Sequence, residues 1–312
     1  MSRYREQLPQ LSRETLLTDG GMETTLIFHQ GLDLPYFAAF VLLDDEEGRD
    51  QLRSYYRPYV ELARKRGVGI VLDTPTWRAN ADWGKRLGYS AEALADVNRR
   101  GVALLEELRS ISDDGPPIII SGCIGPRGDG YRVDEKMSAE DAQKYHAPQI
   151  ATFADTVADL VTALTLTYTD EAVGIVRAAQ AIGVPVVISF TVETDGRLPS
   201  GESLHKAVDA VDGATGGGPA YFMINCAHPT HFADVLADMD SSLGRIRGLR
   251  ANASTKSHAE LDESDELDAG DPVDLAARYG ALRAQLPHLT VVGGCCGTDH
   301  RHIGEICAVF VD

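Results

Sequence analysis

Short, nearly continuous apolar runs alternate along this chain with longer amphipathic stretches. Eight runs rich in β-branched residues predict strands over residues 15–20, 68–74, 117–125, 157–165, 184–191, 220–226, 245–252 and 288–295. The stretches between them repeat apolar positions at helical spacing and predict helices over residues 47–66, 91–109, 139–155, 170–182, 203–211, 231–239, 272–286 and 300–309. Apolar strands that alternate with helices are typical of a parallel sheet that is buried on both faces.

Eight consecutive strand–helix units favour an α/β fold of the closed (β/α)₈ type, the TIM barrel. The alternative is a doubly wound open sheet, which often carries a glycine-rich phosphate-binding motif after its first strand. The sequence has no such motif at that place and no P-loop. Because the sequence shows no linker either, we expect residues 1–312 to form a single barrel domain.

The charge balance limits the kinds of partner that the protein can bind. With 29 Lys+Arg against 47 Asp+Glu, the formal net charge is −18, whereas a surface that binds nucleic acid or an anionic membrane needs a basic patch. The N-terminal residues lack the apolar core of a signal peptide. We therefore expect a cytoplasmic protein with small-molecule partners, and the oligomeric state stays open. The acidic segment 260–274 is interpreted as a solvated loop.

The cysteines carry the strongest chemical signal in this chain. Of five cysteines, Cys226 follows the sixth predicted strand, and Cys295 and Cys296 follow the eighth. Catalytic groups of a barrel come from the carboxyl ends of its strands, so these three thiols should meet at one mouth. Three protein thiolates with one open position are the form of a catalytic zinc site. The three cysteines are therefore predicted to bind Zn²⁺ and to be essential for catalysis.

Two other interpretations of these thiols were considered. Free cysteines can pack as small apolar side chains, and Cys295 with Cys296 could form a redox pair, although adjacent cysteines bridge poorly. Cys307 fits packing, because it lies in a predicted helix. The roles of Cys123 and His228 stay open.

A zinc ion held by three thiolates suits a particular kind of reaction. Such an ion activates water poorly, but it binds a further thiol, lowers the pKa of that thiol and keeps it as a nucleophilic thiolate. This chemistry predicts attack by a substrate thiol on an electrophilic carbon. It also explains why the sequence shows no convincing catalytic triad or pair of carboxylates.

Five motifs together resemble the homocysteine S-methyltransferase family along nearly the whole chain. They are residues 17–21 (LTDGG), 76–80 (TWRAN), 121–126 (SGCIGP), 225–226 (NC) and 293–297 (GGCCG). The resemblance implies a zinc-dependent barrel enzyme that methylates homocysteine to methionine. It places the zinc ligands on Cys226, Cys295 and Cys296.

The resemblance also implies residues that hold the substrates. The aspartate and glycine that help to hold the amino-acid acceptor correspond to Asp19 and Gly20. Residues after the second strand correspond to Thr76 and Trp77, and the asparagine after the seventh strand corresponds to Asn252.

The sequence departs from the family pattern at two positions. Many members carry a glutamate at the end of the fourth strand that binds the amino group of homocysteine, but Leu164 stands there, and Thr25 replaces another glutamate. An uncharged leucine cannot neutralise an ammonium group. Glu23, Glu193 or Asp195 are candidates to substitute for it.

This departure leaves three hypotheses for the function. The first is methyl transfer to homocysteine. The second is the same chemistry on a different thiol, and the third is a non-catalytic relative that binds zinc.

The methyl donor is expected to be a small onium compound, such as S-methylmethionine, S-adenosylmethionine or betaine. The sequence shows no attached module that resembles a cobalamin or folate domain. Aromatic faces attract such cations. The candidates follow the first two predicted strands: Tyr36, Phe37, Phe40, Trp77 and Trp83. Each of them could equally serve in packing.

Overall fold

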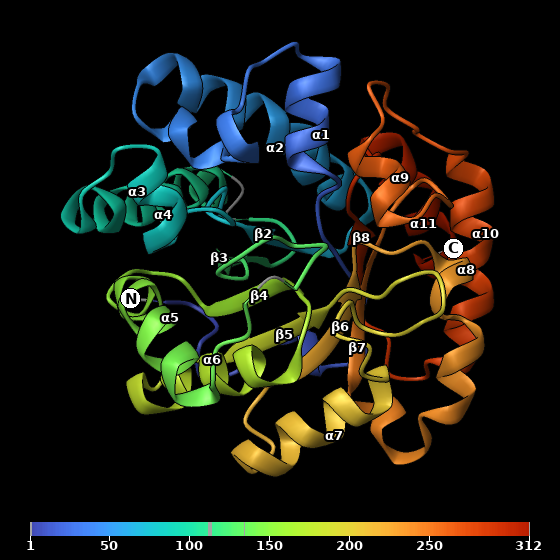
Figure 1. Ribbon diagram of the computed structural model, residues 1–312. Helices are drawn as coiled ribbons and strands as arrows, with labels where there is room; N and C mark the ends of the chain where they lie inside the picture. Colours follow the sequence, from blue (N-terminus) through green and yellow to red (C-terminus); the bar gives the residue numbers. More distant parts are fainter. Residues whose placement is uncertain (1, 112–113, 134, 312) are drawn as a thin grey trace.

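The computed structural model describes residues 2–111, 114–133 and 135–311. Within these residues, eight parallel strands form a closed barrel in sequence order, and β8 pairs back onto β1 (Figure 1). The strands are β1 (Leu16–Leu17), β2 (Gly69–Asp73), β3 (Ile118–Ile124), β4 (Leu160–Leu166), β5 (Val186–Phe190), β6 (Tyr221–Asn225), β7 (Ile246–Ala251) and β8 (Val291–Gly294). The predicted (β/α)₈ barrel is confirmed.

Helices surround the barrel and cover the outer face of its sheet (Figure 1). The α-helices are α1 (Met22–Thr24), α2 (Glu46–Arg66), α3 (Ala81–Arg86), α4 (Ala91–Ile111), α5 (Ala139–Ala154), α6 (Thr169–Ile182), α7 (Leu204–Thr215), α8 (Pro229–Phe232), α9 (His258–Asp262), α10 (Pro272–Gln285) and α11 (His300–Val311). Shorter helical turns are η1 (Pro9–Leu11), η2 (Thr25–His29), η3 (Pro35–Phe37), η4 (Ala39–Leu43), η5 (Asp234–Asp238) and η6 (Asp240–Arg245). In the described part of the chain, no helix is both long enough and apolar enough to span a membrane.

Two predicted elements differ from those in the structure. The first predicted strand, residues 15–20, is reduced to β1, although Thr18 N still donates to the Val292 carbonyl at 2.9 Å. Beyond Asp19 the chain turns into α1 instead of continuing the ladder. The predicted helix over residues 231–239 is divided into α8 and η5, because Pro229 starts the helix early and its turns tighten after Phe232.

The amino-terminal half of the barrel interior is apolar. Leu16, Val71, Ile119 and Leu160 belong to a buried cluster there, and Leu8 covers it from the N-terminal segment. The backbone amides of Arg3 and Tyr4 donate to Asp159 Oδ1 at 2.8 and 2.9 Å, while Arg109 Nη1 donates to Asp159 Oδ2 at 2.9 Å. These polar contacts fasten the N-terminal segment to the end of the barrel opposite the strand carboxyl ends.

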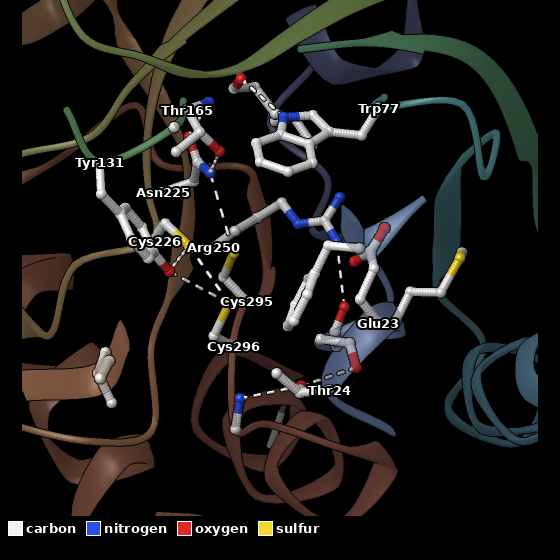
Figure 2. A pocket seen from close by; sticks show the side chains of 18 of the residues that line it. Glu23, Thr24, Trp77, Tyr131, Thr165, Asn225, Cys226, Arg250, Cys295 and Cys296 are labelled. Carbon is white, nitrogen blue, oxygen red and sulfur yellow. Dashed lines mark hydrogen bonds between the residues drawn. The ribbon is translucent and has the colours of Figure 1, made fainter. Parts of the chain in front are cut away.

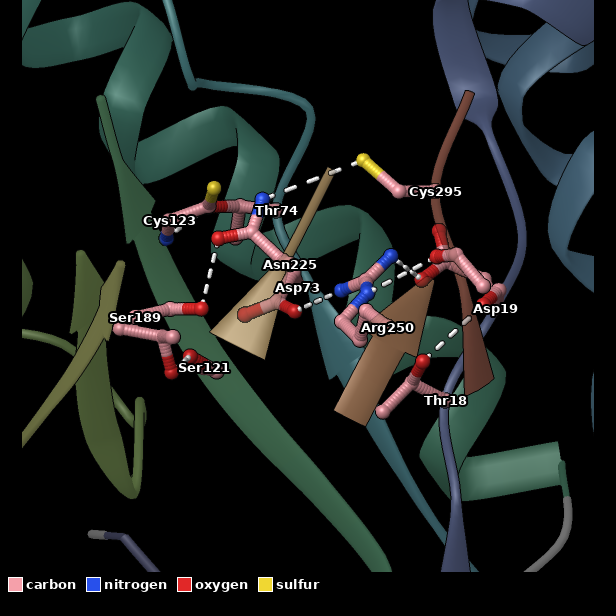
Figure 3. A network of polar contacts seen from close by, with 12 residues as sticks. Thr18, Asp19, Asp73, Thr74, Ser121, Cys123, Ser189, Asn225, Arg250 and Cys295 are labelled. Atoms are coloured by element: carbon pink, nitrogen blue, oxygen red, sulfur yellow. Dashed lines mark hydrogen bonds and ion pairs between the residues drawn. The ribbon is translucent and has the colours of Figure 1, made fainter. Parts of the chain in front are cut away.

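The other half of the interior is polar. Side chains from several strands form a connected network, which Figure 3 shows around Arg250 of β7 and Asn225 of β6. Ser121 Oγ lies 2.7 Å from Thr162 Oγ1, and Ser189 Oγ donates to Asn225 Oδ1 at 2.6 Å. Polar side chains therefore collect toward the carboxyl ends of the strands, where the cysteines also lie.

Candidate active site and metal centre

A cavity of about 250 Å³ lies at the carboxyl ends of the strands. Its wall combines residues at the carboxyl ends of β1, β2, β3, β4, β6, β7 and β8 or in the loops that follow some of them. The wall includes all three cysteines that the sequence predicts to bind zinc: Cys226, Cys295 and Cys296. The topology therefore joins residues from opposite ends of the chain at a single pocket.

The three sulfur atoms lie together within this cavity (Figure 2). Cys226 Sγ lies 2.9 Å from Cys295 Sγ and 3.6 Å from Cys296 Sγ. Among the described residues, they are the one set of three or more histidine, cysteine and acidic side chains whose ligand atoms all lie within 4.8 Å of one another. Soft thiolate donors in this number fit Zn²⁺ and leave a fourth position facing the cavity.

The backbone around these sulfurs adopts conformations that few residues tolerate. Cys226 has a φ of 57°, in the left-handed region that is strained for a residue with a side chain. Asn252 Nδ2 and His258 Nε2 hold its carbonyl oxygen at 3.0 and 2.7 Å. On the other side, a Cβ on Gly294 would lie 2.0 Å from Thr298 Oγ1. The glycine before Cys295 is therefore required for close packing.

Polar groups surround the sulfurs. The Tyr131 hydroxyl lies 3.3 Å from Cys226 Sγ and 3.5 Å from Cys296 Sγ, and its ring stacks on His258 at 4.1 Å. Asn225 Nδ2 approaches Cys295 Sγ at 3.9 Å. Contacts with the other two thiols lower the pKa of Cys295 and raise the pKa of Cys226. The cluster thus favours at least one thiolate.

A buried ion-pair network forms part of the cavity wall. Arg250 donates to Asp19 Oδ1 and to Asp73 Oδ2, each at 2.5 Å, and its Nε donates to the Gly294 carbonyl at 3.1 Å. Tyr55 also donates to Asp19, at 2.9 Å. Burial raises the pKa of Asp19 to about 6, although Arg250 opposes the shift. The network connects β1, β2 and β7 with the turn that carries the cysteines.

The predicted substrate residues occupy two kinds of position. Asp19, Gly20 and Trp77 lie on the cavity wall. Thr76 is fully buried and donates to the Cys123 carbonyl at 2.7 Å, and Asn252 supports Cys226 from behind. Neither of these two side chains is part of the wall formed by the described residues. A contact of any of the five residues with substrate stays a prediction.

The end of β4 has the apolar character that the sequence predicts. Leu164 lies on the wall, and the register between β4 and β5 shifts just after Ala163, where Thr165 has a φ of 64°. Of the three acidic residues considered as substitutes, Glu23 of α1 lies on the cavity wall. Glu193 Oε1 instead lies 3.0 Å from His258 Nδ1, and Asp195 is exposed.

The aromatic candidates for donor binding are dispersed. Phe37 and Trp77 lie on the wall, together with Phe28, which the sequence analysis did not single out. Tyr36 contacts Trp83 with ring centroids 5.7 Å apart. Phe40 is buried against Tyr89. Two of the five predicted aromatic residues therefore face the cavity.

The acidic segment 260–274 does more than extend into solvent. It begins within α9, and five of the six residues of the segment that line the cavity are Asp262, Ser264, Glu266, Leu267 and Asp268. Leu261 of the same segment also contributes to the wall. Several of its acidic residues are exposed, as expected of a solvated loop, but the segment also forms one rim of the mouth.

The remaining candidates lie outside the sulfur cluster. His228 caps the start of α8, and burial lowers its pKa to about 4. Cys123 lies on the cavity wall apart from the three sulfurs, and burial raises its pKa well above the usual value. Cys307 is buried within α11.

Sequence reasoning missed Tyr131, Arg250 and His258. All three are common polar residues with no motif around them. Arg250 is one of three arginines in the predicted strand over residues 245–252, so nothing in the sequence distinguished it from the other two.

Comparison with known proteins defines the class of protein. The family model described as homocysteine S-methyltransferase matches residues 16–310. The chain therefore belongs to the homocysteine S-methyltransferase family. The resemblance expected from the five motifs is confirmed.

Individual relatives agree with this assignment. Methionine synthase from Mycobacterium tuberculosis (strain ATCC 25618 / H37Rv) is 28% identical over 329 residues, covering 97% of this chain and 25% of the relative. The chain thus spans 25% of the length of that curated relative. The oxidized form of homocysteine methyltransferase MmuM from Escherichia coli superposes with a TM-score of 0.76 at 21% identity. Its metallated form gives 0.74 at 20% identity. Each alignment covers 98% of this chain and 99% of that chain, which supports the fold.

Proposed function

We propose that this chain transfers a methyl group from a small onium donor to the thiol of homocysteine, giving methionine. The observation that carries the proposal is the convergence of Cys226, Cys295 and Cys296 in a cavity at the strand carboxyl ends. The family assignment and the names of the relatives support the same reaction. We place it in the cytoplasm, where thiols stay reduced, on a chain that acts as one barrel domain.

The three cysteines are the residues that would hold Zn²⁺. When bound, zinc would keep the acceptor sulfur as a thiolate by lowering its pKa. The thiol proton leaves to solvent, and the sulfur forms a bond to the methyl carbon of the donor. The bond between that carbon and the donor's positive sulfur or nitrogen breaks, and its electron pair stays with the neutral leaving group.

The chain's own residues position and shield this reaction. Tyr131 and Asn225 place polar hydrogens beside the sulfurs, which stabilises negative charge there. Phe28, Phe37 and Trp77 give the wall aromatic faces that suit a cationic donor. The acidic rim of segment 260–274 adds negative charge, which attracts a cationic donor.

Metal analysis combined with variants tests the proposal. We expect about one zinc per chain after purification under reducing conditions without added metal. Cys226→Ser, Cys295→Ser and Cys296→Ser should each lose zinc and methyl transfer. Cys123→Ser is the matched control, because Cys123 lies on the same wall outside the cluster and its replacement should leave zinc bound.

The transfer assay separates the proposal from its alternatives. Methionine formation from homocysteine is measured with S-methylmethionine, S-adenosylmethionine and betaine as donors. Zinc without transfer to any thiol would indicate a non-catalytic relative, and transfer only from methylcobalamin would exclude an onium donor. Full activity in a metal-free triple cysteine variant would refute the proposal.

One observation favours a second candidate, the same transfer to a different thiol. Leu164 lies on the cavity wall at the place where many family members have an acidic residue. An acceptor without an ammonium group would fit this apolar surface. Comparing turnover of homocysteine with that of thiols that lack an amino group distinguishes the two acceptors.

A further inference from the structure

Glu23 presents a carboxylate to the cavity and forms no ion pair with another described residue, although the Arg250 charge is near enough to lower its pKa. It is half-buried in α1 and lies on the same wall as the three cysteines (Figure 2). Within the described chain, no other residue donates a hydrogen bond to its carboxylate or forms an ion pair with it. A shielded charge without a partner is costly, so this position is suited to a positively charged ligand.

The other shielded carboxylates of the wall already have partners. Asp19 and Asp73 both pair with Arg250. Asp129 Oδ1 accepts from Tyr131 N at 2.7 Å, and the remaining one, Asp268, accepts from the Ser254 hydroxyl. Among the described residues of the wall, Glu23 is therefore the shielded acid that is left for a ligand.

The position of Glu23 relates it to the thiol end of the acceptor. It follows the Asp19-Gly20-Gly21 turn, where a Cβ on Gly21 would lie 2.6 Å from the Cys295 carbonyl oxygen. Burial raises the pKa of Glu23 to about 7, and the nearby Cys295 and Asp19 charges add to the shift. The carboxylate and the three sulfurs thus line one cavity, in which a single amino-acid thiol would meet both.

We propose that Glu23 is the residue that selects the acceptor, by binding the ammonium group of an amino-acid thiol. It supplies the negative charge that Leu164, on the wall of the same cavity, cannot supply. This inference rests on the proposed methyl transfer to a thiol and names the class of acceptor, a thiol amino acid.

Calorimetric titration of the zinc-loaded protein tests the inference. The probes are L-homocysteine and its des-amino analogue, which keeps the thiol and the carboxylate. We expect the unmodified protein to bind homocysteine about ten- to a hundredfold more tightly, the range for one hydrogen bond to a charged group. In Glu23→Gln this preference should disappear, while the affinity for the des-amino thiol stays the same.

Glu266→Gln is the matched control. Glu266 belongs to the same wall, but it is exposed at the rim, so its loss should leave the preference unchanged. An equal loss of preference in this control would overturn the inference, because it would indicate general electrostatic attraction. Equal binding of both thiols to the unmodified protein would overturn it without any variant.

Failure of this inference is distinguishable from failure of the proposed function. If Glu23→Gln keeps the preference while methyl transfer to homocysteine proceeds, the role of Glu23 alone is refuted. If the unmodified protein binds neither thiol and transfers no methyl group, the proposed function and this inference fall together. Zinc content and thermal unfolding of each variant show that a change in affinity is not a loss of fold.

Discussion

At the scale of single residues, the sulfur cluster depends on neighbours that orient it. Cys226 keeps its left-handed backbone because Asn252 and His258 hold its carbonyl oxygen. The Tyr131 hydroxyl then contacts two of the three sulfurs. Groups that orient metal ligands commonly change metal affinity when they are removed.

Tyr131→Phe should therefore weaken zinc binding. The variant keeps the ring that stacks on His258 and loses the hydroxyl that contacts Cys226 and Cys296. We expect zinc affinity to fall about ten- to a hundredfold, measured by competition with a chromophoric chelator. Tyr145→Phe is the control, because its hydroxyl binds Asn80 away from the cavity. Unchanged affinity in Tyr131→Phe would contradict this role.

Replacing Arg250 with Met should leave two buried carboxylates without their cation. Arg250 pairs with Asp19 and Asp73, so we expect the free energy of unfolding to fall by about 3–5 kcal/mol at pH 7. Urea unfolding measures this loss.

The loss in Arg250→Met should become smaller as the pH falls. The pKa of Asp19 is raised to about 6, so the folded state takes up a proton near pH 6, whereas an unfolded aspartate stays charged down to about pH 4. A raised carboxyl pKa makes the folded state more stable at lower pH. Repeating the unfolding at pH 5 should give a smaller difference between the two proteins, and an equal or larger difference would contradict the ion-pair account.

At the scale of elements, the sequence predicts the regular strands and helices well because their apolar periodicity is strong. It predicts the segment after β1 poorly, since α1 and η2 depend on contacts with distant residues. Gly297 N donates to Thr24 Oγ1 at 3.2 Å across 273 positions of the chain. No local pattern reports such a contact, so the turn that presents Glu23 was not predicted as a helix.

Helix α11 provides a test at this scale. Asp299 precedes it and accepts from Arg301 N at 2.9 Å, while Asp299 N donates to His302 Nδ1 at 3.1 Å. Asp299→Ala should lower the free energy of unfolding by about 1–2 kcal/mol, the usual cost of losing a helix N-cap.

Charge makes this loss depend on pH. Hydrogen bonds from His302 and Arg301 outweigh burial and lower the pKa of Asp299. A carboxylate with a lowered pKa stabilises the folded state at pH values above its pKa in the unfolded chain, which is near 4. This stabilisation is lost as the pH falls further. Thermal unfolding at pH 7 and pH 3 should therefore show a smaller effect of the substitution at pH 3. The same loss at both pH values would show that the carboxylate charge has no part in it.

At the scale of the whole molecule, the two ends of the barrel differ in the polarity of their residues. The end with the cysteines is polar and open, and the other end is apolar and closed by the N-terminal segment through Asp159. The cysteine site was predictable because parallel strands bring their carboxyl ends to one face. Arg250 and its partners were not, because 231 and 177 positions separate it from Asp19 and Asp73.

Asp159→Asn should separate stability from function. It leaves the buried Arg109 without its charge partner, so we expect about 3–5 kcal/mol less stability in urea unfolding. The KM for the acceptor should stay the same, because Asp159 lies at the end opposite the cavity. Asp155→Asn, at an exposed position nearby, serves as the control. A changed KM in Asp159→Asn would show that the two ends are coupled.

The closure of the barrel by β1 and β8 has a consequence for the order of assembly. β1 contributes two residues, Leu16 and Leu17, which pair with Val291 and Val292 near the end of the chain. During synthesis, Cys226 leaves the ribosome 69 residues before Cys295. The three sulfurs therefore meet only after β8 has been made and has paired with β7, which already pairs with β6. Binding of a metal by all three thiolates then belongs to a late stage of folding, after the last strand of the barrel has been synthesised.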